Sequence, residues 1–234
     1  MYSNTYPVFN LSEAAPNVRA AFIRKTYLHL AGAIGAFALL ETVLLNLQIT
    51  RELAYKVLTM PYGFLMVMGG FVLVGFLARS MATASTSKPV QYAGLGLYVI
   101  LEAIIFVPLL LLALYRSGGG DMIAQAGIMT TLLFAGLTAT VFITRKDFSF
   151  LGSILTVGGF IALGLIITGA IFGFNLGLWF SVGMVVLAAG AILYTTSNIL
   201  NTYNEDQYVA AALELFAAVA LMFWYILRIL MSRK

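Results

Sequence analysis

The chain has 234 residues, of which 62% are hydrophobic and 9% charged, and its formal net charge is +4. A soluble domain carries roughly 25% charged residues, so this composition excludes a water-soluble protein and indicates one membrane domain. The basic residues form no basic face, which excludes nucleic acid as a partner, and the absence of cysteine excludes disulfides and thiol catalysis.

Seven apolar segments, each long enough to cross about 30 Å of hydrocarbon as a helix, account for nearly the whole chain. We expect them at residues 26–48, 58–78, 90–114, 122–144, 149–173, 178–200 and 208–230. The sequence thus predicts an all-α polytopic protein with a short cytoplasmic tail at residues 1–25 and a seven-helix membrane domain at residues 26–230. Asn204, with Gln207 three residues later, is a candidate cap for the last helix.

The orientation is predicted from the basic residues, because cytoplasmic loops are enriched in lysine and arginine. With the N-terminus on the cytoplasmic side of the cell (inner) membrane, the inner segments hold seven basic residues and the outer loops three. The basic C-terminal end, which includes Arg228, opposes this count because seven crossings place it outside. We predict a cytoplasmic N-terminus and an external C-terminus.

Glycines are frequent inside the predicted helices, as in Gly69-Gly70, Gly94-x-Gly96 and Gly158-Gly159. In a membrane, small residues let helix backbones approach one another, so we interpret these glycines as packing sites. Gly94-x-Gly96 lacks the remaining glycine and the strand of a dinucleotide-binding loop.

Three carboxylates lie within the predicted spans, namely Glu41, Glu102 and Glu214. A charged carboxylate facing lipid costs several kcal/mol. We therefore expect Glu102 and Glu214 to face the bundle interior, and both a functional and a structural role remain open for each. Pro108 predicts a kink near Glu102. Glu41 lies nearer its helix end, and we expect its side chain to extend to the membrane surface.

Catalytic and cofactor signatures are missing from the sequence. His29 is the single histidine, so no two-histidine metal site can form; a proton sensor and an interfacial residue without a role both fit it. There is no nucleophile-elbow motif around a serine, and every lysine lies in a tail or turn, which excludes a retinal-binding protein. We expect no enzymatic activity, no metal site and no cofactor.

Three segments carry a resemblance to a known family. They are Thr144-Arg145-Lys146-Asp147-Phe148-Ser149-Phe150-Leu151, Ile192-Leu193-Tyr194-Thr195-Thr196-Ser197-Asn198-Ile199 and Tyr225-Ile226-Leu227-Arg228-Ile229-Leu230. With them the chain resembles the Bax inhibitor family (transmembrane Bax inhibitor motif proteins), in particular its bacterial YccA-like branch. The resemblance implies a central last helix surrounded by the other six, a proton-gated calcium leak in some members, and partnership with a membrane-bound AAA protease in the YccA-like branch.

The resemblance also implies roles for single residues. The aspartate pair of the calcium-conducting members corresponds to Thr195 and Ala218, so both carboxylates are missing and the pH-sensing site is altered. Arg79 matches a basic partner of that pair, and Arg228 matches a residue that closes the pore. Arg145, Lys146 and Asp147 match the family's turn motif. From spacing alone, Glu214 lies one turn before Ala218 on the same helix face and can carry a displaced carboxylate function.

Two functional hypotheses result. The first is a leak channel for calcium or another cation, with Glu102 and Glu214 as interior acids and with Arg79 and Arg228 as their basic partners. The second is a protein without transport activity that binds and restrains a membrane-bound AAA protease. The sequence leaves both open, and the lipid bilayer is the one partner common to them.

Overall fold

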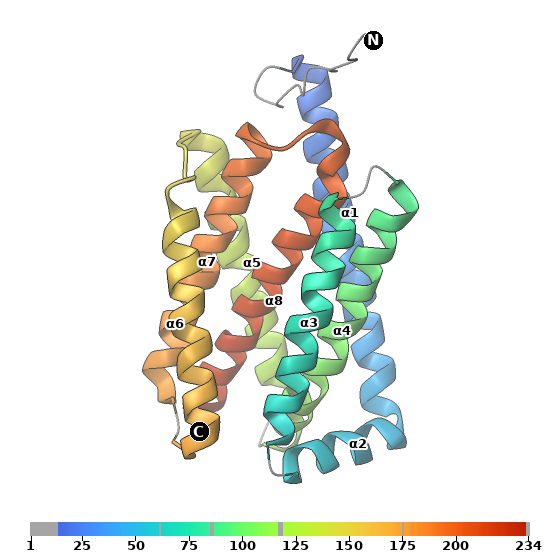
Figure 1. Ribbon diagram of the computed structural model, residues 1–234, viewed down its shortest axis with the longest axis vertical. Coiled ribbons are helices and arrows are strands. Elements are labelled where there is room, and N and C mark those ends of the chain that lie inside the picture. The colour runs from blue at the N-terminus through green and yellow to red at the C-terminus, as the bar shows by residue number, and fades with distance from the viewer. Residues whose placement is uncertain (1–13, 61, 85–86, 117–118, 175, 233–234) are drawn as a thin grey trace, which may run out of the picture.

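A computed structural model describes residues 14–60, 62–84, 87–116, 119–174 and 176–232 of the chain. Helices dominate these ranges (Figure 1). They are α1 (Pro16–Asn46), α2 (Gln48–Thr59), α3 (Gly63–Ala84), α4 (Lys88–Tyr115), α5 (Gly119–Thr144), α6 (Leu151–Phe172), α7 (Gly177–Asn201), the 3-10 turn η1 (Glu205–Gln207) and α8 (Tyr208–Ser232).

The predicted all-α membrane architecture is confirmed. Within the described ranges, six helices are long and apolar enough to cross a membrane, namely α1, α4, α5, α6, α7 and α8. α3, with 22 residues, stands in the place of the remaining predicted span. The largest differences in bounds are at α1, which begins at Pro16 and so includes part of the predicted tail, and at α3, which is shifted toward the C-terminus.

α2 was not predicted, because its short polar sequence does not resemble a membrane span. It lies across one end of the bundle, at an angle to the long helices (Figure 1). Ala54 is buried, whereas Ile49 and Leu53, which share a different face of the helix, are exposed. A helix with polar residues on one side and exposed apolar residues on the other is suited to the membrane–water interface.

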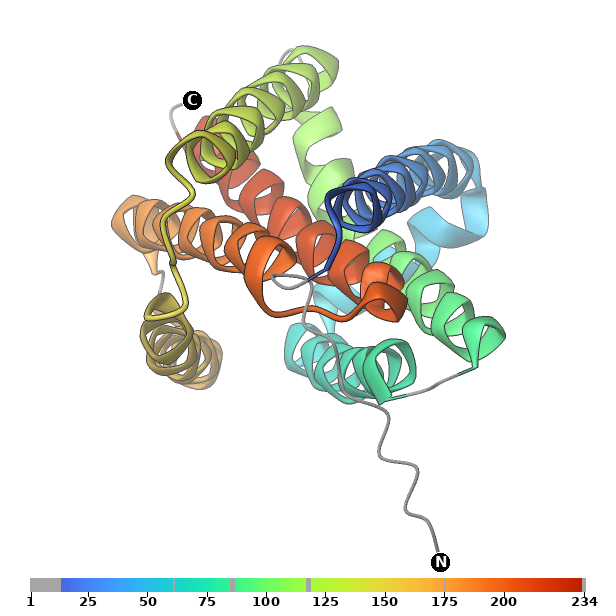
Figure 2. The ribbon, with the colours of Figure 1, turned by 90° about the horizontal axis from the view of Figure 1, so that it is seen from above.

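α8 occupies the centre of the bundle, as predicted (Figure 2). It packs against α1, α3, α4, α5 and α7. Aromatic side chains fill the middle of this core: the ring of Phe37 lies 5.1 Å from that of Phe106 and 5.9 Å from that of Phe216. α6 lies farther out than the other long helices and packs chiefly on α7.

Close helix packing at glycine is confirmed at two of the predicted positions. A Cβ atom on Gly94 would lie 2.6 Å from the carbonyl oxygen of Ala78, which shows how closely α3 approaches α4, and one on Gly158 would lie 2.6 Å from Leu187. The interpretation is not supported at the other four glycines, where an added Cβ meets no atom of the described chain within 4 Å: Gly69, Gly70, Gly96 and Gly159.

The start of α1 and the end of α8 lie at opposite ends of the bundle. The start of α1 and the turn between α5 and α6 lie at one end, and α8 finishes at the other (Figure 1). The start of α1 and the Arg145-Lys146-Asp147 turn therefore share one end of the bundle, in agreement with the prediction of a common side, and the end of α8 lies at the opposite end. The cytoplasmic location of the first side stays a prediction.

Candidate functional site

Buried polar side chains gather in the half of the bundle that holds the start of α8. Thr26 lies near the start of α1 and Gln91 near the start of α4, and both are buried. At the same end, α7 finishes with a buried polar run of Thr195, Thr196 and Ser197. Because buried polar groups are costly in an apolar environment, this half of the bundle is the candidate functional site.

One acidic group of the site is Glu102, which is buried in α4, as predicted. Tyr98 lies one turn earlier on the same helix face and supplies a side-chain hydrogen bond to the Glu102 carboxylate, while Arg79 of α3 supplies positive charge. The Arg79 guanidinium lies 5.8 Å from the centre of the Tyr98 ring. Arg79 itself remains exposed, so the buried acid is connected to a cation at the edge of the bundle. α4 continues through Pro108 without a break.

The second acidic group is Glu214 of α8, which is partly buried. The hydroxyl of Tyr203 donates a hydrogen bond to its Oε2 atom over 2.7 Å. Burial, and next the negative charge of Glu214, raise the pKa of Tyr203 above its ordinary value of 10.0. Arg79 is near enough to act electrostatically on Tyr203 as well. The guanidinium of Arg79 thus acts both on Glu102 and on Tyr203, the hydrogen-bond partner of Glu214.

The positions that match the family's aspartate pair, Thr195 and Ala218, are both buried. They lie on α7 and α8, which pack extensively on each other. The nearby hydroxyls of Tyr27, Thr138 and Thr196 approach one another from α1, α5 and α7, although none is hydrogen-bonded to another described group. The polar groups around Thr195 and Ala218 are therefore neutral hydroxyls, and neither position carries a carboxylate.

The Arg145-Lys146-Asp147 turn is held by hydrogen bonds to Ser149 and to the end of α7. Arg145 adopts a left-handed backbone conformation with φ of 50°. Asp147 accepts hydrogen bonds from the Ser149 amide at 2.8 Å and the Ser149 hydroxyl at 3.1 Å, and the Phe148 amide donates to Ser197 at 3.0 Å. The turn is thereby fixed to the end of α7, while Arg145, Lys146 and Asp147 stay exposed.

Arg228 and Glu41 lie away from this site. Arg228 follows Glu214 along α8 by about 21 Å at 1.5 Å per residue, and its guanidinium lies 5.8 Å from the Tyr225 ring, so it does not join the predicted acids. The expectation that Glu41 extends to the membrane surface is wrong. Its carboxylate is buried without a hydrogen bond to any described group, because its helix face packs beside Leu44 and Leu45 against α2 and α4.

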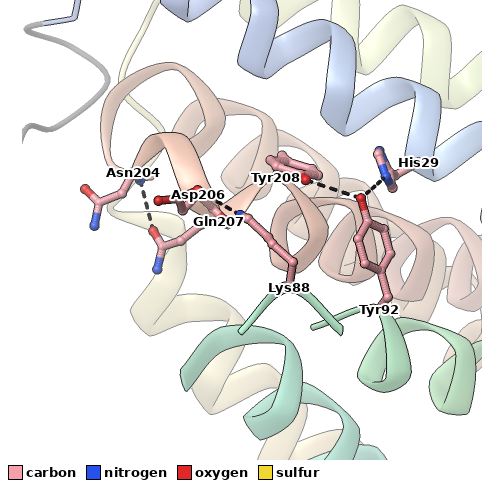
Figure 3. A network of polar contacts seen from close by, with 7 residues as sticks. All are labelled: His29, Lys88, Tyr92, Asn204, Asp206, Gln207 and Tyr208. Atoms are coloured by element: carbon pink, nitrogen blue, oxygen red, sulfur yellow. Dashed lines mark hydrogen bonds and ion pairs between the residues drawn. The ribbon is translucent and has the colours of Figure 1, made fainter. Parts of the chain in front are cut away.

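A second polar network joins α1, α4 and the start of α8 (Figure 3). His29 Nδ1 lies 2.7 Å from the Lys25 carbonyl, so Nδ1 is the donor, and Nε2 lies 3.0 Å from the Tyr92 hydroxyl. That hydroxyl lies 3.2 Å from the hydroxyl of Tyr208. Lys88 forms an ion pair of 2.9 Å with Asp206. These contacts fix the starts of three helices relative to one another.

The predicted cap before α8 is formed in part. Gln207 Oε1 accepts a hydrogen bond from the Asn204 amide at 2.9 Å, and it does so on η1 rather than on α8 itself (Figure 3). This contact orders the segment that contains Tyr203.

The sequence did not identify the two tyrosines that bind the acids. Tyr98 could have been found, since it stands four residues before Glu102; Tyr203 reaches Glu214 across η1 and has no such signal. Among the described residues, no three His, Asp or Glu side chains come together in a way that could hold a metal ion.

Comparison with known proteins places these features in a family. The sequence pattern of the family described as "Inhibitor of apoptosis-promoting Bax1" matches residues 19–234. The protein named "Modulator of FtsH protease YccA" of Escherichia coli is 37% identical over 118 residues, which is 50% of this chain and 53% of that protein. The protein named "Protein LIFEGUARD 4" of Arabidopsis thaliana is 29% identical over 224 residues, covering 92% and 86%.

An uncharacterized protein of Pseudomonas aeruginosa is 37% identical over 123 residues, or 52% of this chain and 55% of the relative. The matches to the bacterial relatives thus span about half of their length, whereas the match to the plant protein runs through nearly the whole membrane domain.

Proposed function

The chain belongs to the Bax inhibitor family, and we propose that it is a non-enzymatic membrane protein that lets a cation, with calcium as the first candidate, pass through the bundle. The path runs beside α8, and the Arg79, Glu102 and Glu214 groups control it. The pH-sensing site is altered, because Thr195 and Ala218 replace its carboxylates.

The observation that supports this function is a pair of acids within the bundle that lie close to one cation at its edge. Glu102 from α4 and Glu214 from α8 each have a tyrosine partner, and Arg79 acts on Glu102 and on Tyr203, the partner of Glu214. Carboxylates within a membrane face bundle interiors and mark ion pathways. Arg79 balances their charge in the closed bundle, and movement of its exposed side chain would leave the acids free to bind a cation.

Calcium entry into liposomes tests this function. The purified protein is reconstituted into liposomes loaded with a calcium-sensitive dye, and calcium is added outside. We expect Glu102→Gln and Glu214→Gln each to lower the rate of entry, because each removes a charge while retaining the side-chain shape. Glu52→Gln, the same change on the exposed face of α2, should leave the rate unchanged. Entry no faster than into protein-free liposomes would reject the proposal.

A second candidate function is modulation of a membrane-bound AAA protease. Two observations favour it: the relative named as a modulator of FtsH protease, and the neutral residues Thr195 and Ala218, which remove the family's aspartate switch. In this case the bundle binds the protease without conducting ions, and Arg79, Glu102 and Glu214 serve to stabilise the fold.

Degradation assays distinguish the two functions. The protein and an FtsH-type protease are reconstituted together with a membrane protein substrate, and the rate of substrate loss is measured. Modulation predicts a slower loss and co-purification of the two proteins, and Glu102→Gln should leave both unchanged while it reduces calcium entry. Substrate loss at the same rate with and without the protein would reject this second function.

A further inference from the structure

A groove runs along the outer surface of the bundle between α1 and α4. Its volume is about 680 Å³. The lining is apolar over most of its length, and His29 and Tyr92 stand at one end. The apolar part is formed by Leu28, Gly32, Ala36, Leu39, Gly96 and Ile100.

Glycine creates the hollow. A Cβ atom added to Gly32 or to Gly96 would meet nothing within 4 Å, so no other part of the described chain fills the space above them. The groove extends along α1 from His29 to Leu40, a rise of about 16 Å at 1.5 Å per residue. That is roughly half of the 30 Å hydrocarbon core, which is the depth of one leaflet.

Positive charge lies at the polar end of the groove. The ammonium groups of Lys25 and Lys88 lie 5.3 and 4.5 Å from the centre of the Tyr208 ring, whose hydroxyl contacts Tyr92, and both act electrostatically on Tyr92. Asp206 neutralises Lys88. Lys25 is exposed and has no carboxylate within 4.0 Å in the described part of the chain. Within the described part of the chain, a cation without a carboxylate partner therefore lies at the polar end of the groove.

We propose that the groove binds one acyl chain of an anionic phospholipid, and that Lys25 holds the phosphate at the His29–Tyr92 end. The mainly apolar lining disfavours a water-soluble ligand, the length matches one leaflet, and Lys25, which has no carboxylate partner among the described residues, favours an anionic headgroup. A second copy of the chain is a poorer occupant. A two-fold axis along the membrane normal would place the two Lys25 side chains at the same depth, where like charges repel.

Lipid binding to the purified protein tests the proposal independently of any ion transport. Native mass spectrometry counts bound lipids while the protein, in a nonionic detergent, is titrated with dioleoyl phosphatidylglycerol or dioleoyl phosphatidylcholine. We expect the wild-type protein to prefer the anionic lipid about fivefold, the effect of one lysine near a membrane surface. Lys25→Gln should remove that preference and Lys25→Arg should retain it. Arg24→Gln, the same charge change at the neighbouring position, should retain it too.

Filling the groove provides the second arm of the experiment. Gly96→Leu should weaken the binding of both lipids, because its side chain projects into the open space. Gly136→Leu is the matched control, since an added Cβ on this α5 glycine also meets nothing within 4 Å, and it should change neither. Gly32→Leu replaces Gly96→Leu if that variant does not fold.

Two results would overturn the proposal. Equal affinity of the wild-type protein for the two lipids would show that the site does not recognise an anionic headgroup. Normal binding of both lipids by a groove-filling variant would show that the groove does not hold the acyl chain. If such a variant instead converts a dimer into a monomer in the same spectra, the occupant is a second copy and the lipid proposal is wrong.

Discussion

The hydroxyl of Tyr203 donates a hydrogen bond of 2.7 Å to Glu214 across the turn that leads into the central helix. The ring of Tyr203 also packs on Phe22 of α1, with the ring centres 6.2 Å apart. One side chain thus fixes an acid of α8 and connects the start of α1 to the core. The stability of the fold and the position of Glu214 should therefore depend on the same hydroxyl.

Removal of that hydroxyl by Tyr203→Phe should destabilise the protein. The partly buried Glu214 loses its donor, and a hydrogen bond to a charged group contributes about 1.5–3 kcal/mol. The melting temperature in detergent, followed by circular dichroism, measures the effect. Tyr115→Phe removes a hydroxyl from a residue that is 79% exposed and should leave the melting temperature unchanged. Equal melting temperatures for the two variants would contradict the prediction.

Alkaline pH should destabilise the wild-type protein more than the Tyr203→Phe variant. Burial and Glu214 raise the pKa of Tyr203 in the folded state, so the folded protein holds this proton more tightly than the unfolded chain. The resulting stability is complete below about pH 10, the unfolded value, and is lost as the pH rises through the folded value. Melting temperatures measured from pH 9 upward should fall more steeply for wild type than for the variant. Parallel curves would show that Tyr203 does not contribute.

The long helices were predictable because each is a continuous apolar run, and a chain in lipid must satisfy its backbone hydrogen bonds within such a helix. α2 was not predicted because it is short and contains no continuous apolar run. Glu41 shows a related limit. Its distance from the helix end suggested that it reaches water, but the packing of α2 and α4 over that end decides its burial, and packing between distant segments is not visible in the chain itself.

The site was predictable as a set of residues and not as an arrangement. The cost of a carboxylate in lipid identified Glu102 and Glu214 as interior groups. The choice of Arg79 over Arg228 required the three-dimensional structure, because α3 brings Arg79 near Glu102 and near the tyrosine partner of Glu214, while Arg228 lies far along α8. Tyr203, the direct donor to Glu214, lies in the turn between α7 and α8, outside the predicted spans.

Gly94 and Gly96 should respond oppositely to the same substitution. In Gly94→Ala the new Cβ would lie 2.6 Å from the Ala78 carbonyl oxygen and 3.0 Å from the Ala82 nitrogen. Backbone atoms cannot move aside without separating α3 from α4, so we expect a loss of about 1–3 kcal/mol. Gly96→Ala meets open space and should retain or slightly raise the melting temperature, because alanine favours helix. Similar losses for both variants would show that α4 glycines act through something other than contact with α3.

Asp147 should stabilise the turn between α5 and α6 without contributing to ion passage. Asp147→Ala removes the acceptor for the Ser149 amide and hydroxyl, and a hydrogen bond of this kind contributes about 1 kcal/mol. We expect a lower melting temperature and an unchanged rate of calcium entry per folded protein. Lys146→Ala, at the adjacent exposed position, should affect neither quantity. Loss of calcium entry at an unchanged melting temperature would instead assign the motif turn to the conduction path.

Chemical labelling should place the two ends of the bundle on opposite sides of the membrane. The chain has no cysteine, so Lys146→Cys and Ser232→Cys each introduce a single reactive thiol at an exposed position. An impermeant maleimide added outside intact cells should label Ser232→Cys, and it should label Lys146→Cys only after lysis, because the excess of basic residues predicts a cytoplasmic location for the α5–α6 turn. The reverse pattern would invert the orientation while leaving the fold intact. Labelling of both variants from the same side would contradict the passage of α8 through the full depth of the bundle.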